Sequence, residues 1–250
     1  MKTALDRLRA IRTPIVYDAI ERFGVRSRQE GYTDNTIRCI LPSLGAFVGY
    51  AVTGRIMAEV PHEPGSPRVE WEAVWNHIAA APKPSIMVCQ DMDQPAGRGC
   101  AWGDVSASIF RRLGCNAVIT NGAVRDIRAV EAIGFGLFAA GPIVGHANVR
   151  FVGIGGPVKV GGLVVHPGDL IHVDEHGATI IPAGIDLDEL VRVADEFLAS
   201  EARVIKYAQT SKSFSVAGLR AEMDRHDAAE YRVVEAPAKK PRGKGAQPSK

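Results

Sequence analysis

Two aspartates and an arginine stand at a spacing that can bind a small charged ligand. Gly103-Asp104 is followed, 20 residues later, by Arg125-Asp126, so the pattern reads Gly-Asp-x20-Arg-Asp. The guanidinium of Arg125 is permanently charged and presents a rigid fork of donors, which suits a negatively charged oxygen. The carboxylate of Asp126 can hold a hard divalent cation, largely through water. The glycines allow a ligand to approach the backbone closely.

Each aspartate opens a segment that is predicted to be helical. Asp104 begins residues 104–113 and Asp126 begins residues 126–133, and a glycine follows each segment as a C-terminal cap would. A strand-like apolar run precedes each of them, at residues 86–89 and 117–120. Two consecutive strand-to-helix turns therefore carry the two aspartates. In a parallel α/β arrangement such turns lie at one edge of the sheet, where helix N-termini offer amides to an anion.

The same residues also have structural interpretations. Aspartate is a preferred N-cap residue, so Asp104 or Asp126 alone indicates no more than a helix start. Arg125 could equally pair with a neighbour at the surface, where ion pairs contribute little. The combination of all three with flanking glycines favours a functional site.

Three stretches of the sequence together resemble one known family, which contains the RraA regulator of RNase E and the class II 4-hydroxy-4-methyl-2-oxoglutarate aldolases. The resemblance extends from about Asp18 to about Ala208 and implies an α/β fold, a swivelling β/β/α sandwich of the RraA-like type in a single domain. The stretches are Gly103-Asp104, Gly122-Ala123-Val124-Arg125-Asp126 and the run Val158-Lys159-Val160-Gly161-Gly162-Leu163-Val164-Val165-His166-Pro167-Gly168-Asp169-Leu170.

The resemblance implies a metal-dependent lyase that acts on a short 2-oxo acid. Family members are pyruvate-releasing aldolases, oxaloacetate decarboxylases and a protein inhibitor of an RNase. Breaking a carbon–carbon bond beside a 2-oxo group leaves an enolate, which a Schiff-base lysine or a cation must stabilise. No lysine lies between Pro84 and Pro157, which disfavours the Schiff base. The alternative is a non-catalytic regulator that binds a ribonuclease or an RNA helicase.

The resemblance also assigns roles to the residues of the pattern. Asp126 is expected to be the direct ligand of Mg²⁺ or Mn²⁺, and Arg125 to bind the oxo or enolate oxygen. Asp104 is expected to orient a metal-bound water that serves as the base. The backbone amides around Gly103 and Val105 are expected to take the substrate carboxylate.

Family members also use a glutamate near the C-terminal helix of a neighbouring subunit, within a homotrimer or a dimer of trimers. Glu201 is the match in this chain, and an exposed surface glutamate is the alternative. It falls close to an apolar stripe at helical spacing, Leu187, Leu190, Ala194, Leu198 and Ile205.

Several other reactive side chains have two interpretations. His146 could face the same cleft or could be a structural histidine in a loop. Cys100 could be a catalytic nucleophile, although the sequence identifies no supporting base. His172 and His176 stand four apart across a strand-to-turn boundary, where that spacing does not bring side chains together as it does in a helix, so we expect no zinc site there.

Length and composition fit one enzyme-sized domain. The 250-residue chain is 46% hydrophobic and can bury a core without disulfides. Its four cysteines have no C-x-x-C spacing and are typical of a reduced, cytoplasmic protein. Residues 1–11 lack the apolar run of a secretory signal, and the uncharged stretch of residues 132–145 is too short and glycine-rich to span a bilayer. We expect no membrane contact.

The end of the chain differs in composition from the rest. We assign residues 1–235 to the domain, with a helical extension after about residue 208, and residues 236–250 to a disordered basic tail. The tail holds five cations and no acid; the whole chain has a net charge of +2, and the part before the tail has −3. The tail could contact RNA or an acidic partner, but a solvated tail is the commoner meaning of such a run, so we expect no nucleic-acid partner.

The remaining elements are predicted from periodicity and punctuation. Trp71, Trp75 and Ile78 predict a helix, with both tryptophans packed on the core. Thr13-Pro14 predicts the start of another helix, with Thr13 as its N-cap. The expected strands are residues 45–52, 158–160, 163–165, 170–173 and 179–181.

Overall fold

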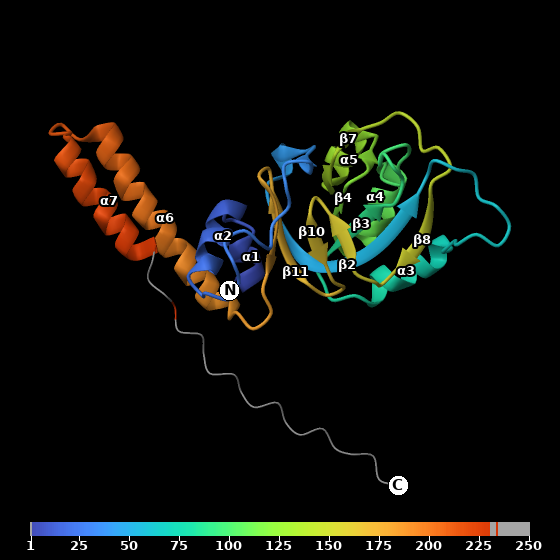
Figure 1. Ribbon diagram of the computed structural model, residues 1–250, viewed down its shortest axis with the longest axis horizontal. Coiled ribbons are helices and arrows are strands. Elements are labelled where there is room, and N and C mark those ends of the chain that lie inside the picture. Colours follow the sequence, from blue (N-terminus) through green and yellow to red (C-terminus); the bar gives the residue numbers. More distant parts are fainter. Residues whose placement is uncertain (1, 231–233, 235–250) are drawn as a thin grey trace, which may run out of the picture.

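The computed structural model describes residues 2–230 and residue 234 of the chain. It has one α/β body, from which two long helices project (Figure 1). The elements in chain order are α1 (Ala4–Leu8), α2 (Thr13–Glu21), β1 (Arg38–Cys39), a 3-10 turn (Pro42–Leu44), β2 (Phe47–Met57), α3 (Trp71–Ala80), β3 (Ser85–Asp91), α4 (Asp104–Arg112), β4 (Cys115–Thr120), β5 (Ala123–Val124), α5 (Ile127–Ile133), β6 (Gly136–Ala139), β7 (Gly141–Pro142), β8 (Arg150–Ile154), β9 (Val158–Val160), β10 (Leu163–Val165), β11 (Leu170–Asp174), β12 (Gly177–Ile181), α6 (Leu187–Thr210) and α7 (Val216–Glu230).

An eight-stranded mixed sheet, nearly closed like a barrel, forms the centre of the body. Its order is β1-β6-β4-β3-β2-β11-β12, and β8 also pairs with β2. The strands β2, β3, β4 and β6 are parallel, whereas β1, β8, β11 and β12 run antiparallel to their neighbours. The parallel part places the carboxyl ends of β3 and β4 side by side, as the two strand-to-helix turns predict.

Strand β2 connects the two halves of the sheet. Along one edge, residues 50–56 pair with the whole of β3. Along the other edge, residues 47–50 pair with β11 and residues 54–57 pair with β8. One long strand thus joins the parallel α/β units to the antiparallel strands that follow them in the sequence.

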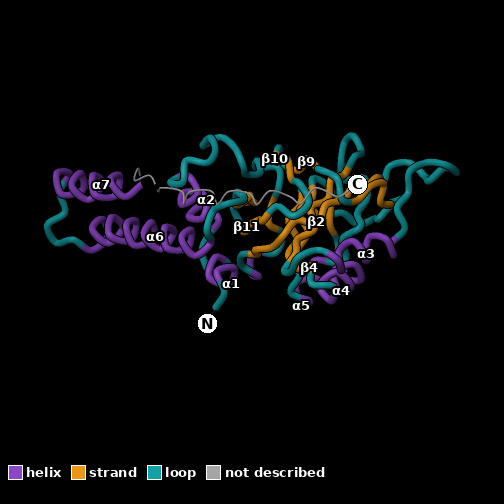
Figure 2. Tube along the Cα trace, turned by 90° about the horizontal axis from the view of Figure 1, so that it is seen from below, coloured by secondary structure: helices purple, strands orange, loops and turns teal. Residues whose placement is uncertain are grey.

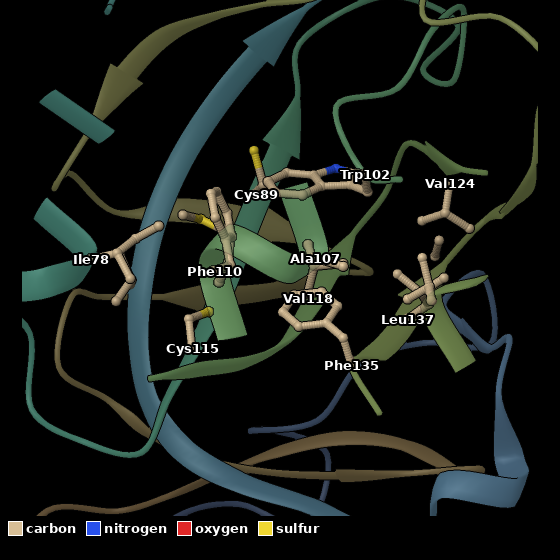
Figure 3. Packing of buried hydrophobic residues seen from close by; sticks show 14 of the residues in the cluster. Ile78, Cys89, Trp102, Ala107, Phe110, Cys115, Val118, Val124, Phe135 and Leu137 are labelled. Carbon is tan, nitrogen blue, oxygen red and sulfur yellow. The ribbon is translucent and has the colours of Figure 1, made fainter. Parts of the chain in front are cut away.

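Two separate cores cover the two faces of the parallel strands. Helices α3, α4 and α5 pack on one face, where Trp102 and Phe110 lie edge to face at 5.7 Å between ring centroids (Figure 3). The hairpin of β9 and β10 covers the other face through Val158, Val160 and Leu163. Both faces are therefore apolar, as expected for parallel strands.

A third cluster joins the helices at the far end of the sheet. Apolar residues of α1, α2 and α6 pack together with Val48 of β2 and Ile181 of β12. Beyond this cluster, α6 continues into the turn that leads to α7, and the two helices form a hairpin directed away from the sheet (Figures 1 and 2). The hydroxyl of Ser200 on α6 lies 3.0 Å from Nδ1 of His226 on α7.

The predicted elements are present, with shifted boundaries. The α/β architecture in a single domain is confirmed, as are both helices that the aspartates open and all the expected strands, although β2 extends five residues past its predicted end. Two caps were predicted wrongly: Gly103 rather than Asp104 precedes α4, and Arg12 rather than Thr13 precedes α2. The apolar stripe on α6 is wrong at its end, because Ile205 is exposed.

The predicted basic tail, residues 236–250, lies outside the described residues. Within the part that the structure describes, none of the helices combines the length and the apolar character that crossing a bilayer requires.

Candidate active site

The ends of β3 and β4 are fastened to each other by a pair of hydrogen bonds. The backbone N–H of Asp91 donates to Oδ1 of Asn121 at 2.8 Å, and Nδ2 of Asn121 donates to the carbonyl of Asp91 at 2.9 Å. Asp91 is the last residue of β3, and Asn121 directly follows β4. The pair of hydrogen bonds therefore fixes the positions of the two strand ends relative to each other.

The carboxylate of Asp91 organises the loop that leaves β3. It is 2% exposed and accepts the backbone N–H groups of Asp93 at 3.0 Å and Gly97 at 2.7 Å. Burial raises the pKa of Asp91, against these two hydrogen bonds, which lower it. A Cβ on Gly122 would lie 2.8 Å from Oδ2 of Asp91, so only glycine fits beside this carboxylate.

The loop returns to the sheet at Trp102. Its carbonyl accepts the backbone N–H of Arg125 at 2.9 Å, and its ring is buried against Phe110 and Phe151. The next residue, Gly103, touches the second turn. A Cβ there would lie 2.4 Å from Oδ2 of Asp126, so the missing side chain lets the two turns meet.

Asp126 has an unusual backbone conformation. Its φ of 55° and ψ of 36° place it in the left-handed region, which L-residues other than glycine adopt at a cost and which aspartate tolerates better than most. It occupies the N-cap position of α5, but its side chain makes no capping hydrogen bond. The structural interpretation of Asp126 as an ordinary cap is therefore wrong, and its carboxylate is available to a ligand.

Arg125 and Asp126 form the ion pair that the sequence suggests. Nε of Arg125 lies 3.1 Å from Oδ2 of Asp126, and about a third of each side chain is exposed, at 36% and 34%. Both side chains face a cavity of about 320 Å³. Its polar wall also contains Gly103, Asp104 and Ser106. A second, more open hollow on the other side of the pair is lined again by Asp104, Arg125 and Asp126.

The structure thus gathers five of the six predicted site residues around one cavity. Gly103, Asp104, Val105, Arg125 and Asp126 all line it. Glu201 does not: it lies on α6, where its carboxylate is 3.6 Å from the guanidinium of Arg12. Its predicted role in a neighbouring subunit's site stays a prediction.

The two backbone amides expected to bind the substrate carboxylate already have partners. Gly103 donates its N–H to Oγ of Ser106 at 3.0 Å, and Val105 donates to Oδ1 of Asp104 at 2.8 Å. A substrate carboxylate can use these amides only after the side chains of Ser106 and Asp104 turn away from them.

Two side chains with open interpretations also reach the cavity. His146 lies in its wall, with Nδ1 3.1 Å from the carbonyl of Ala147. Cys100 lies there too, but burial raises the pKa of its thiol, and the nearby Arg125 lowers it only in part. A thiol held neutral in this way is a poor nucleophile.

His172 does not line the cavity. It is buried, and its two ring nitrogens lie 2.9 Å from Oγ1 of Thr13 and 2.9 Å from the carbonyl oxygen of Leu8, so it has a structural role.

The sequence did not predict the apolar wall of the cavity. Trp71 and Trp75 of α3 line it, together with Ile109 and Val149. Both tryptophans were expected to pack on the core; this is confirmed for Trp71, which packs against the core cluster and on Phe151, but Trp75 is exposed. The spacing of four between the tryptophans places them on one face of the helix, which was the available signal.

The donors in the cavity fit a hard divalent cation. Asp104 and Asp126 are the two carboxylates among the described residues of its wall, and Oδ2 of Asp126 is the atom paired with Arg125. Mg²⁺ and Mn²⁺ prefer oxygen ligands, and Mg²⁺ takes one or two carboxylates while keeping several waters. Asp126 would hold the ion and Asp104 would face it.

Comparison with known proteins agrees with the fold. Residues 13–180 match the RraA-like family described as Aldolase/RraA. A Halalkalibacterium halodurans protein, provisionally named 4-hydroxy-4-methyl-2-oxoglutarate aldolase, is 34% identical over 102 residues, which are 40% of this chain and 49% of that protein. The chain therefore spans about half the length of this curated relative.

Two solved structures have the same fold. An uncharacterised protein from Pseudomonas syringae pv. tomato superimposes with a TM-score of 0.66 at 22% identity, over 87% of this chain and 92% of that one. Streptomyces coelicolor RraAS2, described as an unusual member of the RNase ES inhibitor RraA family, gives 0.61 at 22% identity, over 80% and 94%. Since the family match covers most of the described body, this chain belongs to the RraA-like, Aldolase/RraA family.

Proposed function

We propose that this protein is a divalent-metal-dependent lyase that cleaves a carbon–carbon bond of a short 2-oxo acid. The reaction is either the retro-aldol cleavage of a 4-hydroxy-2-oxo acid to pyruvate or the decarboxylation of oxaloacetate. The observation that carries the proposal is the conformation of Asp126. Its strained backbone and its uncapped helix leave the carboxylate beside Arg125, facing a cavity.

Arg125 binds the 2-oxo oxygen of the substrate. When the bond between C3 and C4 breaks, its electron pair moves toward this oxygen and an enolate forms. The guanidinium stabilises that developing negative charge, because its charge is permanent and its donors are fixed in direction. Asp126 would hold a divalent cation, which would supply further stabilisation of the developing negative charge. Protonation of C3 then gives pyruvate.

Asp104 acts as the general base in the aldol reaction. As C4 becomes a carbonyl, its hydroxyl loses a proton, and the Asp104 carboxylate in the wall accepts this proton directly or through one water. The decarboxylation of oxaloacetate releases CO₂ instead and needs no base at this step. The two reactions therefore share Arg125 and differ in their dependence on Asp104.

We place the second half of the site on a neighbouring copy of the chain. Glu201 lies outside the cavity of its own protomer, and α6 and α7 project from the body, where a neighbour can contact them (Figure 1). A homotrimer, or a dimer of trimers, in which Glu201 reaches the next protomer's cavity is the assembly we propose. The four cysteines are all free, which is consistent with a reduced, cytoplasmic location.

A panel of substrates tests the proposal. Pyruvate release is measured from 4-hydroxy-2-oxo acids and from oxaloacetate, with Mg²⁺, with a chelator, and with Mg²⁺ or Mn²⁺ restored after chelation. Turnover of at least one compound should disappear with the chelator and return with the metal, and borohydride should trap no covalent adduct. An absence of turnover with every compound would instead support the regulator, whose binding to a ribonuclease or helicase would then be measured.

A further inference from the structure

The cavity has two chemically different ends. Its polar end holds Asp104, Arg125 and Asp126, where the reacting carbons bind. The rest of its lining is mainly apolar and comes from three elements, with Trp71 and Trp75 of α3, Ile109 of α4 and Val149 of the loop before β8, and His146 also belongs to this wall. A substrate that is bound by Arg125 in this cavity and is longer than the reacting carbons can extend onto this surface.

The packing of α3 holds the two tryptophans in place. Val74 and Ile78, which neighbour the tryptophans around the helix, are buried in the core, and Trp71 packs against the same core cluster. Trp71 packs edge to face on Phe151 at 5.2 Å between ring centroids, and Trp75 lies 6.4 Å from Trp71 at an interplanar angle of 30°. Phe151 therefore supports the ring of Trp71, and Trp75 lies beside that ring.

This apolar surface is open to solvent in the protein alone. Trp75 is 36% exposed, and Val105, at the start of α4, is 70% exposed. Large apolar side chains gathered in a concave wall are typical of ligand sites, where a few polar groups fix the orientation and the apolar wall binds the rest of the ligand. Burying such side chains under an apolar ligand is favourable in proportion to the area removed from water.

The charges of the wall disfavour a substrate that carries a second carboxylate beyond its reacting carbons. Arg125 is the permanent cation in the described part of the wall, and it already serves Asp126 and the reacting end. A distal carboxylate would lie against tryptophan and aliphatic side chains with no cation to pair it. Removing an unpaired carboxylate from water is costly.

Two further arginines stand in an adjoining hollow, and each has a partner there, although the buried Nε of Arg150 has none among the described residues. Arg68 forms an ion pair with Glu70 at 2.9 Å. Arg150 donates from one terminal nitrogen to the carbonyl of Val60 at 2.7 Å. Trp71, His146 and Val149 line both this hollow and the cavity, whereas Arg68 and Arg150 line the hollow alone.

We infer that the substrate of this site is a 2-oxo acid with an apolar, preferentially aromatic group beyond its reacting carbons, held by Trp71, Trp75, Ile109 and Val149. The part of the substrate beyond the reacting carbons carries no carboxylate. This inference rests on the proposed function for the placement of the reacting end at Arg125.

A matched pair of ligands tests the inference without requiring turnover. 2-Oxo-4-phenylbutanoate and 2-oxoglutarate have the same four-carbon oxo-acid chain and differ only in a terminal phenyl or carboxylate group. Their affinities for the full-length protein with Mg²⁺ are measured by calorimetry. We expect the phenyl compound to bind at least about tenfold more tightly, since it buries apolar area where the carboxylate stays unpaired.

Variants of Trp75 locate the preference. Trp75→Ala should weaken binding of the phenyl compound by about tenfold and change 2-oxoglutarate by less than about twofold. Trp75→Arg should reverse the preference by placing a cation beside the distal carboxylate. Val164→Ala, which trims an exposed apolar side chain on β10 that does not line the cavity, should change neither affinity.

Several results would overturn the inference. These are equal or tighter binding of 2-oxoglutarate, no binding of either compound, or a Trp75→Ala variant whose effect is a changed oligomeric state with an unchanged affinity ratio. The last result would show that a second copy of the chain covers Trp75. Pyruvate release with a preference for dicarboxylates would reject this inference alone, whereas phenyl-selective binding without turnover of any substrate would reject the proposed function alone.

Discussion

Asp126 combines an unfavourable backbone conformation with a side chain that its own helix does not use. The sequence predicts where this residue stands, since Gly-Asp-x20-Arg-Asp and the helix that follows it are legible from residue types and periodicity. It does not predict the left-handed φ, because aspartate adopts that region only when its surroundings impose it. The decisive contact, Gly103 against Asp126, joins two turns 23 residues apart, and local patterns carry no information about it.

The first prediction at this scale concerns Arg125. Arg125→Lys keeps the charge but replaces a planar fork of donors by a point charge, so it should not reproduce the geometry at the oxo oxygen. We expect pyruvate release to fall on the order of 10²-fold, the scale of losing one oxyanion donor. Arg112→Lys, at an exposed position of α4, is the matched control. Near-normal turnover of Arg125→Lys would place Arg125 outside the site.

A second prediction concerns the contact between the two turns. In Gly103→Ala the new Cβ would lie 2.4 Å from Oδ2 of Asp126, so the carboxylate must move and the metal site must open. Turnover and Mn²⁺ affinity should both fall at least about tenfold while the melting temperature changes little, because the carboxylate can turn toward solvent. Gly141→Ala is the control, since nothing lies within 4 Å of its added Cβ. A Gly103→Ala protein with normal metal affinity would contradict this role of the glycine.

The predicted helices are correct, but the surfaces that they pack against could not be predicted from the sequence. The spacing of Trp71 and Trp75 indicates one face of a helix, but which surface that face meets depends on Phe151 and Val149, more than 70 residues later in the chain. The assignment of the tryptophans to the core is confirmed for Trp71 and wrong for Trp75, and their place in the wall of a cavity was not predicted. The sequence also did not predict that Asp91 organises the loop after β3, because an aspartate at this position looks like an ordinary end of a strand.

The third prediction concerns how α2 is joined to the sheet. The buried carboxylate of Asp174, at the end of β11, accepts the N–H of Thr13 at 2.7 Å and that of His176 at 2.9 Å. Burial raises the pKa of Asp174, but these hydrogen bonds outweigh it and hold the pKa below its ordinary 3.8. Because the folded-state pKa is lowered, the stabilisation is present above pH 3.8 and is lost as the pH falls through the lowered pKa.

Asp174→Asn should therefore lower the free energy of unfolding by about 1 to 3 kcal/mol at pH 7. The difference from the wild type should shrink below pH 3.8. Urea unfolding at pH 7 and near pH 3 measures both effects, with Glu175→Gln, an exposed neighbour, as the control. An equal difference at the two pH values would show that the charge of Asp174 is not what stabilises the junction.

For the whole molecule, the sequence predicts the order of elements better than their assembly. Most strands after residue 150 were predicted, but the pairing of β11 and β8 with the two ends of β2 was not. These contacts join residues far apart in the sequence, and burial on both faces of one sheet determines them. The same limit applies to Glu201. The sequence separation of Glu201 from Arg125 does not tell whether Glu201 reaches the cavity of a neighbouring copy. Within one protomer it pairs with Arg12.

The fourth prediction tests the shared site that we propose. Asp126→Ala and Glu201→Ala chains should each be inactive, but refolding them together should restore part of the wild-type rate. Some interfaces in a mixed assembly bring a wild-type Asp126 and a wild-type Glu201 together, whereas no interface of either pure mutant does. The composition of the assemblies is verified by mass. Mixed trimers without activity would make Glu201 an ordinary surface residue.

The central claim is that the Asp126 carboxylate holds the metal on which the cleavage depends. Asparagine tolerates the left-handed backbone and has nearly the same shape, so Asp126→Asn removes the charge with little effect on the fold. Calorimetric titration with Mn²⁺ and pyruvate release are measured on the same samples of both proteins. We predict that the wild type binds the ion and releases pyruvate and that Asp126→Asn, with an unchanged melting temperature, loses both. An Asp126→Asn protein that binds Mn²⁺ normally and turns over at the wild-type rate would contradict the account.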